Sequence, residues 1–289
     1  MVAKRDCWAE WIARTRSHVD PDVRRQGADL HSRWRERILD DAEPIEGSTV
    51  LDVGCGEGLV ALGALARGAE TVIFSDISQD LLDFCRQAAA EQGELDRCRF
   101  IHTSADDLSP IADESVDVVT TRSVLIFVAD KRSAFREFAR VLGPGGRISL
   151  VEPINRFAQR VGGFWAGFDL TAIPEIAAKI RAVYDAIQPP DTDPMLDFDE
   201  RDLIGFAEEA GFYPIELVLE AEIRASQPMK WDTFISRAGN PRIPTIADAM
   251  DQALTPEERR QLTAHLRPLV EEGRGTWRMA MAFLHAVKP

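Results

Sequence analysis

The chain has 289 residues, of which 34 are basic and 48 acidic, so its formal net charge is −14, and 45% of its residues are hydrophobic. This hydrophobic share can fill a substantial core, which excludes wholesale disorder, and the length allows one large domain or a core domain with a sizeable addition. Because a protein that binds polyanions needs a basic surface, the charge disfavours nucleic acid and anionic lipid as partners.

The four cysteines, Cys7, Cys55, Cys85 and Cys98, form no CxxC pair, and the histidines are scattered. This pattern predicts neither a disulfide framework nor a zinc site, and we expect no metal. The N-terminus lacks the apolar segment of a signal peptide, and apolar runs such as residues 124–129 are far too short to span a membrane. We therefore expect a cytoplasmic protein with reduced thiols and no membrane contact.

Residues 1–44 are expected to form a helical N-terminal cap. Trp8, Trp11 and Ile12 recur at the spacing of one helix face, and residues 30, 34 and 38 repeat this pattern. Each apolar stripe is too small to form a core of its own, so both should dock on the rest of the chain.

Strands and helices alternate between residues 45 and 152, which predicts a parallel sheet with helices on both faces. Helices should begin at Leu59, after Ser78 and after Asp130, where the last two residues are natural N-caps. We expect strands at residues 49–53, 71–75, 99–102, 116–120 and 148–151.

Two insertions interrupt this alternation. Residues 153–198 are predicted to form a lid insertion with a helix at residues 174–187. Residues 199–289 should complete the sheet with strands at 215–224 and 276–287, separated by a helical insertion at 228–271. The last helix of that insertion should begin with a capping box between Thr255 and Glu258.

Three glycines follow the first strand in the segment Asp52-Val-Gly-Cys-Gly-Glu-Gly58. Glycine allows a tight turn and lets a ligand lie against bare main chain. A dinucleotide fingerprint would need a glycine where the chain has Leu59, and a phosphate-binding P-loop would need Lys-Ser/Thr. The acidic Asp52 and Glu57 would oppose a phosphate, so the segment favours a ligand with an ammonium or sulfonium group.

This segment resembles the first motif of the class I S-adenosylmethionine-dependent methyltransferases. Three further motifs follow in that family's order within residues 45–152. Asp76 is similar to the ribose-binding acid, Ser104-Ala-Asp-Asp-Leu108 to the adenine-contact segment, and Arg140-Val-Leu-Gly-Pro-Gly-Gly-Arg147 to the signature before strand five. The resemblance implies a Rossmann-like α/β fold with a mainly parallel seven-stranded sheet, and S-adenosylmethionine as the cofactor, with S-adenosylhomocysteine as its product.

The same resemblance implies a cofactor site at the carboxyl ends of the strands. Ile77 would offer adenine an apolar face, and the backbone of Ala105 is favoured over the neighbouring side chains as the contact to the adenine amino group. Arg122 would pair with the cofactor carboxylate, with an acidic substrate, or with a neighbouring acid. The expected cofactor-binding residues are Asp52, Gly54, Gly56, Gly58, Asp76, Ile77, Ser104, Ala105, Asp106, Thr121 and Arg122.

A sulfonium methyl group is already electrophilic, so the protein has to align a nucleophile and exclude water. Glu152, just past strand five, is the candidate for a general base, although an orienting role is favoured for it. Six residues are candidates for lining a substrate pocket, although for each single aromatic residue among them packing of the insertions against the sheet is the favoured explanation. These candidates are Asn155, Arg156, Trp165, Phe168, Tyr184 and Trp231.

The sequence thus predicts a methyltransferase that acts on an O, N or C atom of a small molecule. The alternatives are an RNA or protein methyltransferase with the same core, which the acidic charge disfavours, and a non-catalytic S-adenosylmethionine-binding protein. Both a monomer and a homodimer are compatible with the sequence.

Overall fold

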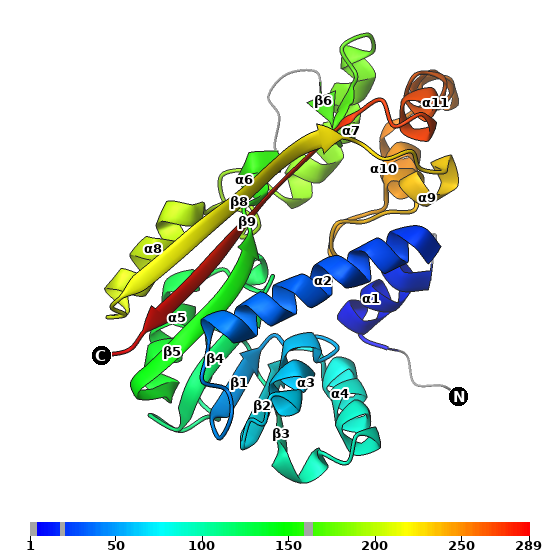
Figure 1. Cartoon of the computed structure of the whole chain (residues 1–289). Helices are drawn as coiled ribbons and strands as arrows, with labels where there is room; N and C mark the ends of the chain where they lie inside the picture. The colour runs from blue at the N-terminus through cyan, green and yellow to red at the C-terminus, as the bar shows by residue number, and fades with distance from the viewer. Residues whose placement is uncertain (1–4, 18–20, 159–163) are drawn as a thin grey trace.

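The computed structural model describes residues 5–17, 21–158 and 164–289. These residues form a seven-stranded sheet in the order β3-β2-β1-β4-β5-β9-β8 (Figure 1). The first five strands pair in parallel, whereas β9 runs antiparallel to both β5 and β8, so the predicted mainly parallel sheet is confirmed. The strands are β1 (Thr49–Val53), β2 (Thr71–Asp76), β3 (Cys98–His102), β4 (Val116–Arg122), β5 (Leu142–Pro153), β8 (Ile215–Ala225) and β9 (Thr276–Val287).

The strand order reverses between β1 and β4. From β1 the chain builds outward through β2 and β3, and it then crosses back to place β4 on the other side of β1. Helices after adjacent strands diverge at such a point and leave a crevice beyond the carboxyl ends of the strands. The glycine-rich segment after β1 lies at this crevice.

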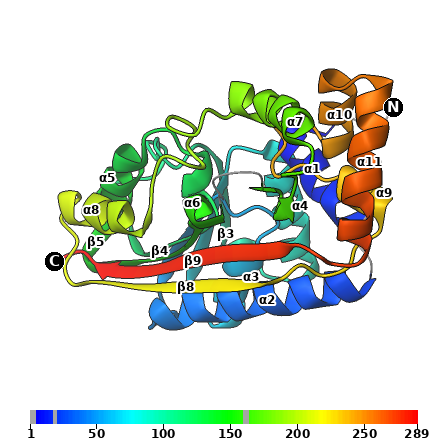
Figure 2. The same ribbon diagram turned by 90° about the horizontal axis from the view of Figure 1, so that it is seen from above.

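Helices cover both faces of the sheet, as predicted (Figure 2). One face packs against α2 (Pro21–Asp41), α3 (Leu59–Ala66) and α4 (Gln79–Glu91), with residues such as Leu39, Ala61 and Cys85 in a shared apolar cluster. The opposite face packs against α5 (Lys131–Val141) and α8 (Glu200–Glu209) through residues such as Phe138 and Leu203. The apolar residues of α5 recur at helical spacing and all lie in this second cluster.

The two insertions pack on each other. The first contains α6 (Asn155–Ala158), the short strands β6 (Phe164–Trp165) and β7 (Phe168–Asp169), and α7 (Pro174–Ile187). The second contains α9 (Trp231–Ile235), α10 (Ile246–Ala253) and α11 (Pro256–Glu271), and the predicted capping box starts α11. Phe168, Ile180, Trp231 and Leu266 belong to one apolar cluster that both insertions share. None of the helices in the described segments is long and apolar enough to cross a membrane.

Strands β4 and β5 extend further than predicted. The fifth strand begins at Leu142 and not at residue 148, because Leu142 already pairs with Val116 before a register shift in the ladder. The fourth strand was expected to end at residue 120. It continues through Thr121 and Arg122, because both residues pair with β5. Helices α1 (Cys7–Ser17) and α2 confirm the helical N-terminal extension.

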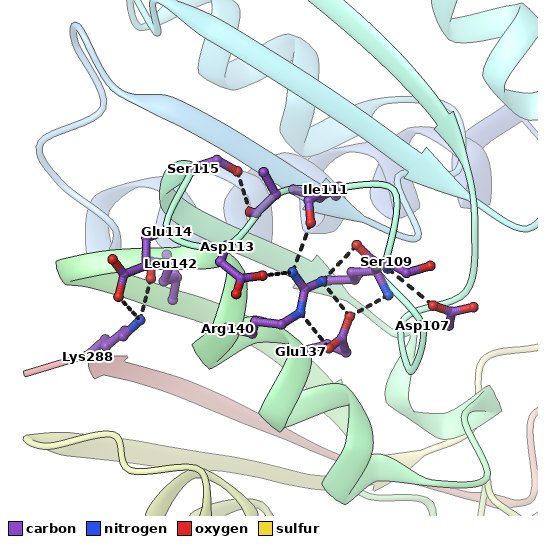
Figure 3. Close-up of polar contacts among 12 residues, drawn as sticks. Asp107, Ser109, Ile111, Asp113, Glu114, Ser115, Glu137, Arg140, Leu142 and Lys288 are labelled. Carbon is purple, nitrogen blue, oxygen red and sulfur yellow. Dashed lines mark hydrogen bonds and ion pairs between the residues drawn. The ribbon is translucent and has the colours of Figure 1, made fainter.

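Arg140 near the end of α5 fixes the segment that follows β3 (Figure 3). Its guanidinium donates to the carbonyl oxygens of Leu108 and Ile111, both at 2.9 Å, and forms ion pairs with Glu137 and Asp113 at 2.7 and 2.6 Å. A carboxylate oxygen of Glu137 also accepts from the Leu108 amide at 2.8 Å. Arg140 therefore ties α5 to the segment that contains the expected adenine contacts.

Replacing Arg140 by methionine should lower the free energy of unfolding by about 2 kcal/mol, since charge-assisted bonds to two carbonyl groups are lost. Arg136→Met on the same helix is the matched control, because Arg136 is 64% exposed and lies 3.9 Å from Asp130; its effect should stay within about 0.5 kcal/mol. Arg140 also holds the pKa of Glu137 below its usual range. The difference between the wild type and Arg140→Met should therefore shrink below about pH 4. Urea unfolding of the three proteins tests this, and equal losses for both variants would contradict it.

Candidate functional site

The glycine-rich loop after β1 is held against the end of β2. The Cys55 amide donates to the Ser75 carbonyl oxygen at 2.9 Å, and the Gly56 amide donates to Asp76 Oδ2 at 2.8 Å. Gly54, Gly56 and Gly58 all have positive φ angles, of 63°, 56° and 78°. Side chains rarely adopt this left-handed conformation, which explains why glycine stands at all three positions.

Two of these glycines face different surroundings. A Cβ atom on Gly54 would lie 2.3 Å from Val124 Cγ2, so the segment after β4 approaches the bare main chain there. A Cβ atom on Gly56 would meet nothing within 4 Å. The space over Gly56 is therefore open, and a ligand could lie against its backbone.

Asp76 joins three of the predicted motifs. Besides the Gly56 amide, its carboxylate accepts from the Ser78 amide at 2.8 Å, and its carbonyl oxygen accepts from the Thr103 amide at 3.1 Å. An ionised carboxylate has about four lone-pair sites, so Asp76 keeps acceptor capacity for two further hydroxyl groups. Burial raises its pKa, and the nearby Asp6 carboxylate adds to this effect.

The segment after β3 lies next to Asp76 and completes this cluster. Ser104 donates its hydroxyl to the Asp106 carboxylate, and Ala105 is buried between them. Ile77 is 43% exposed, a large apolar side chain open to solvent beside the buried Asp76. The structure therefore brings the glycine loop, Asp76, Ile77 and residues 104–106 together at one edge of the sheet.

Asp52 has a different place from the other predicted cofactor residues. It is 2% exposed, its Oδ2 accepts from the Ala61 amide at 3.1 Å, and its Oδ1 accepts from the Thr120 hydroxyl at 2.9 Å. Gly58, the N-cap residue of α3, has no side chain with which to cap the helix. Asp52 supplies this cap from β1, so its hydrogen bonds maintain the loop and do not face the crevice.

Glu152 is fully buried at the end of β5. Its Oε1 accepts from the amides of Val124 and Leu125 at 2.9 and 3.1 Å, which holds the segment that packs on Gly54. Its Oε2 and the Thr121 hydroxyl are buried polar atoms for which no hydrogen-bond partner is found among the described residues. Burial raises the pKa of Glu152 to about 7, while the field of the Arg122 guanidinium opposes this shift.

Helix α1 docks beside the crevice through Trp8 and Trp11 of its predicted apolar stripe, and through Asp6, which the sequence did not single out. Asp6 caps α1 and accepts the Ser78 hydroxyl at 2.6 Å at the start of α4. Trp8 packs edge-on against Phe127 after β4, with ring centroids 4.9 Å apart. The Trp11 indole donates to the Ala238 carbonyl oxygen at 3.1 Å, so α1 joins the core to the second insertion (Figure 1).

A cavity of about 760 Å³ lies under the two insertions. Four of the predicted substrate residues line it: Asn155, Trp165, Phe168 and Tyr184. Trp231 instead stacks on Phe234 in the apolar cluster and is 7% exposed, and Arg156 is exposed outside the lining.

The sequence did not predict the cationic part of this cavity, which contains Arg181, Arg224, Arg237 and Arg278. One signal was available in α7. Its apolar residues 176, 177, 180 and 183 are buried, the first three of them in the shared cluster. Residues 181, 184, 185 and 188 form a second, polar stripe at helical spacing that lines the cavity. No comparable sequence pattern marks Arg224 on β8 or Arg278 on β9. Their place in the cavity depends on how far these two strands extend together.

Comparison with known proteins supports the methyltransferase class that the sequence predicts. Residues 51–150 match the family described as a methyltransferase domain. The tRNA 5-carboxymethoxyuridine methyltransferase of Escherichia coli (strain K12) is 38% identical over 120 residues, which are 41% of this chain and 45% of that protein. The C-methyltransferase UbiE of ubiquinone/menaquinone biosynthesis from Idiomarina loihiensis is 28% identical over 192 residues, 65% of this chain and 75% of that protein. The chain thus spans less than half the length of the first relative.

Residues 51–150 form a methyltransferase domain. Solved structures agree with this fold. The YcgJ protein from Bacillus subtilis superimposes with a TM-score of 0.59 at 20% identity and covers 89% of this chain and 98% of its own. A geranyl diphosphate methyltransferase in complex with S-adenosylmethionine gives a TM-score of 0.53 at 17% identity and covers 89% of this chain and 85% of its own.

The residues beside the methyltransferase domain's crevice fit S-adenosylmethionine, the cofactor that the sequence resemblance implies. S-Adenosylmethionine has two ribose hydroxyl groups, an apolar adenine face and a positive sulfonium. Asp76 offers free acceptor positions, Ile77 an exposed apolar surface, and Gly56 an uncovered main chain. Asp76 is also an acid beside the crevice, which suits a cationic ligand. In the described part of the chain, no group of three or more His, Cys, Asp or Glu could hold a metal ion.

The buried carboxyl groups of Glu152 and Asp52 should make the stability of the chain depend on pH. Because the pKa of Glu152 is raised to about 7, folding favours its protonated form, and stability should fall as pH rises from about 5 to 7. Each such group contributes up to about 1.4 kcal/mol per pH unit in that range. Glu152→Gln should flatten the profile, because a glutamine amide does not titrate. The variant should still fold, since its amide oxygen can accept the Val124 and Leu125 amides.

Asp52, whose pKa burial also raises to about 7, should account for part of the slope that remains. Glu70→Gln is the matched control, since Glu70 is exposed. Urea unfolding at pH 5 and pH 8 compares the three proteins. A Glu152→Gln profile as steep as that of the control would mean that Glu152 does not titrate in this range.

Proposed function

We propose that the chain transfers the methyl group of S-adenosylmethionine to an O, N or C atom of a small-molecule acceptor. The observation that carries this proposal is the hydrogen bond between Asp76 and the Gly56 amide, with open space directly over Gly56. This bond places a carboxylate that can accept ribose hydroxyl groups beside a main chain without a side chain. Both lie where the strand order of the sheet reverses.

In this proposal the residues of the crevice have separate roles. The carboxylate of Asp76 holds the ribose, Ile77 lies against adenine, and the backbone of Ala105 contacts the adenine edge. When bound, the cofactor supplies a methyl group that is electrophilic without further activation. The chain therefore has to orient the acceptor and exclude water.

Glu152 is proposed as a positioning residue. Through Oε1 it holds the segment after β4 against Gly54, and this segment borders the methionine end of the cofactor site. Asp52 belongs to the scaffold of the loop, because its carboxylate caps α3. Helix α1, docked on both the core and the second insertion, limits the access of water.

Two observations favour a small acceptor. The cavity under the insertions borders Asn155, which follows β5 directly, so the acceptor site adjoins the carboxyl edge of the sheet. The net charge of −14 opposes binding of a large polyanion. We infer that the acceptor enters this cavity and meets the methyl group at its inner end.

An RNA acceptor is the second candidate, because a relative with 38% identity over 120 residues is a tRNA methyltransferase. The two candidates differ in salt dependence. Binding of bulk tRNA that weakens steeply as salt is raised would support RNA, because counterions are released from each neutralised phosphate. Absence of tRNA binding at low salt would support the small-molecule proposal.

Calorimetric titration tests the cofactor assignment. The chain should bind S-adenosylmethionine and S-adenosylhomocysteine at micromolar concentrations and should not bind NAD or ATP, because its loop has neither the dinucleotide nor the P-loop pattern. Equal binding of NAD would contradict the assignment, and so would the absence of any binding.

Replacing Gly56 by alanine should separate the cofactor site from the fold. The positive φ angle of Gly56 should lower stability by about 1 kcal/mol, and the new methyl group would project into the open space that the cofactor needs, weakening S-adenosylmethionine binding at least tenfold. Gly93→Ala is the matched control, because Gly93 also has a positive φ and would meet nothing within 4 Å. It should lose similar stability and bind the cofactor normally. Equal cofactor affinities in the two variants would place the cofactor elsewhere.

A further inference from the structure

The cavity under the insertions has a charge opposite to that of the chain. Among the described residues that line it, four are arginines and one, Asp185, is acidic. The chain as a whole has a net charge of −14. Such a concentration of cations in one concave site is not expected from the composition, and it points to a negatively charged ligand.

The four arginines come from four different elements. Arg181 lies on α7, Arg224 near the end of β8, Arg237 just after α9, and Arg278 near the start of β9. Across the β8–β9 ladder, Arg224 is opposite Trp277 and Ile223 is opposite Arg278. The cationic lining therefore depends on the tertiary structure and is not a charged run of the sequence.

Two of these arginines lie in the cavity without a neighbouring acid. In the part of the chain that the structure describes, no acidic group lies within ion-pair distance of Arg237 or Arg278. Arg237 contacts Met229 Sδ at 3.9 Å, and Arg278 Nε donates to the Phe157 carbonyl oxygen at 3.2 Å. Arg224 differs, since its Nε is 3.2 Å from Glu222.

Arg237 is the most informative of the four. Its side chain is accessible to solvent, yet the surrounding protein is dense enough that burial lowers its pKa. These two properties occur together where a side chain lines a concave surface. A guanidinium there keeps its charge, and it is poorly screened, so an anion that reaches it gains strong hydrogen bonds.

Aromatic rings form the rest of the lining. The Trp165 ring lies 6.2 Å from Tyr184 and 6.4 Å from Phe234, measured between centroids, and Trp277 lies 4.1 Å below the Arg224 guanidinium. These rings would cover an apolar or aromatic body, while the arginines would hold an anionic group at its end.

We propose that the methyl acceptor is an organic anion that joins an apolar or aromatic body to a carboxylate, sulfonate or phosphate group, and that Arg237 and Arg278 bind this group. The statement that the bound anion is the methyl acceptor rests on the proposed methyltransferase function. The anion site itself is a property of the cavity, and it is testable without the cofactor.

The test uses two fluorescent probes that differ in one group, anilinonaphthalene sulfonate and its uncharged parent phenylnaphthylamine, titrated into the full chain. The wild type should bind the sulfonate at least tenfold more tightly than the parent. Arg237→Gln should weaken sulfonate binding about tenfold, the effect of one charge-assisted hydrogen bond, and leave the parent unchanged. Arg237→Lys, which keeps the charge, should retain most of the preference.

Arg260→Gln is the matched control, because Arg260 is 70% exposed on α11, outside the cavity. It should bind both probes as the wild type does. Arg278→Gln provides an independent variant if Arg237→Gln lowers the thermal midpoint. Equal binding of the two probes, no binding of either, or a loss in Arg260→Gln as large as in Arg237→Gln would each overturn the anion site.

S-Adenosylmethionine titrations of the same variants keep the two proposals distinct. The arginine variants should bind the cofactor normally, since the cavity lies apart from Asp76. Normal cofactor binding without a sulfonate preference would overturn the anion site alone. A sulfonate preference without cofactor binding would overturn the methyltransferase proposal and leave the anion site supported.

Discussion

The site depends on one carboxylate at the end of β2. Asp76 accepts the amides of Gly56 and Ser78, and through its own carbonyl oxygen it receives the Thr103 amide. It thereby fixes the glycine loop, the start of α4 and the segment after β3 relative to one another. Because these three segments follow different strands, the crevice keeps its shape only while this buried group satisfies all of them.

A second carboxylate has a similar effect on the other side of the crevice. Glu152 orders the segment after β4, which packs against Gly54, and Asp52 caps α3 from within the sheet. Acids that resemble ligands in the sequence can therefore belong to the scaffold. Asp52 and Asp76 differ in what lies beside them. Asp52 bonds Ala61 and Thr120 in the interior, whereas Asp76 bonds the amide of Gly56, over which the space is open.

The sequence predicted the sheet and the glycine loop well, because both depend on local patterns. Alternating apolar strands, N-caps such as Ser78 and Asp130, and glycines that need positive φ angles are all visible in short segments. The cationic cavity was not predictable in the same way. Arg237 and Arg278 are far apart in sequence, and they line the same cavity only because both insertions fold over the extended ends of β8 and β9. The role of Asp6 in docking α1 has the same long-range origin.

The central claim is that S-adenosylmethionine binds across Asp76 with its methyl group directed toward the cavity under the insertions. A crystal structure of the chain with S-adenosylhomocysteine tests it most directly. We expect both ribose hydroxyl groups within hydrogen-bond distance of the Asp76 carboxylate, adenine against Ile77, and the sulfur on the side of the site that faces Asn155. A ribose bound away from Asp76, or a sulfur atom separated from the cavity by the segment after β4, would contradict the claim.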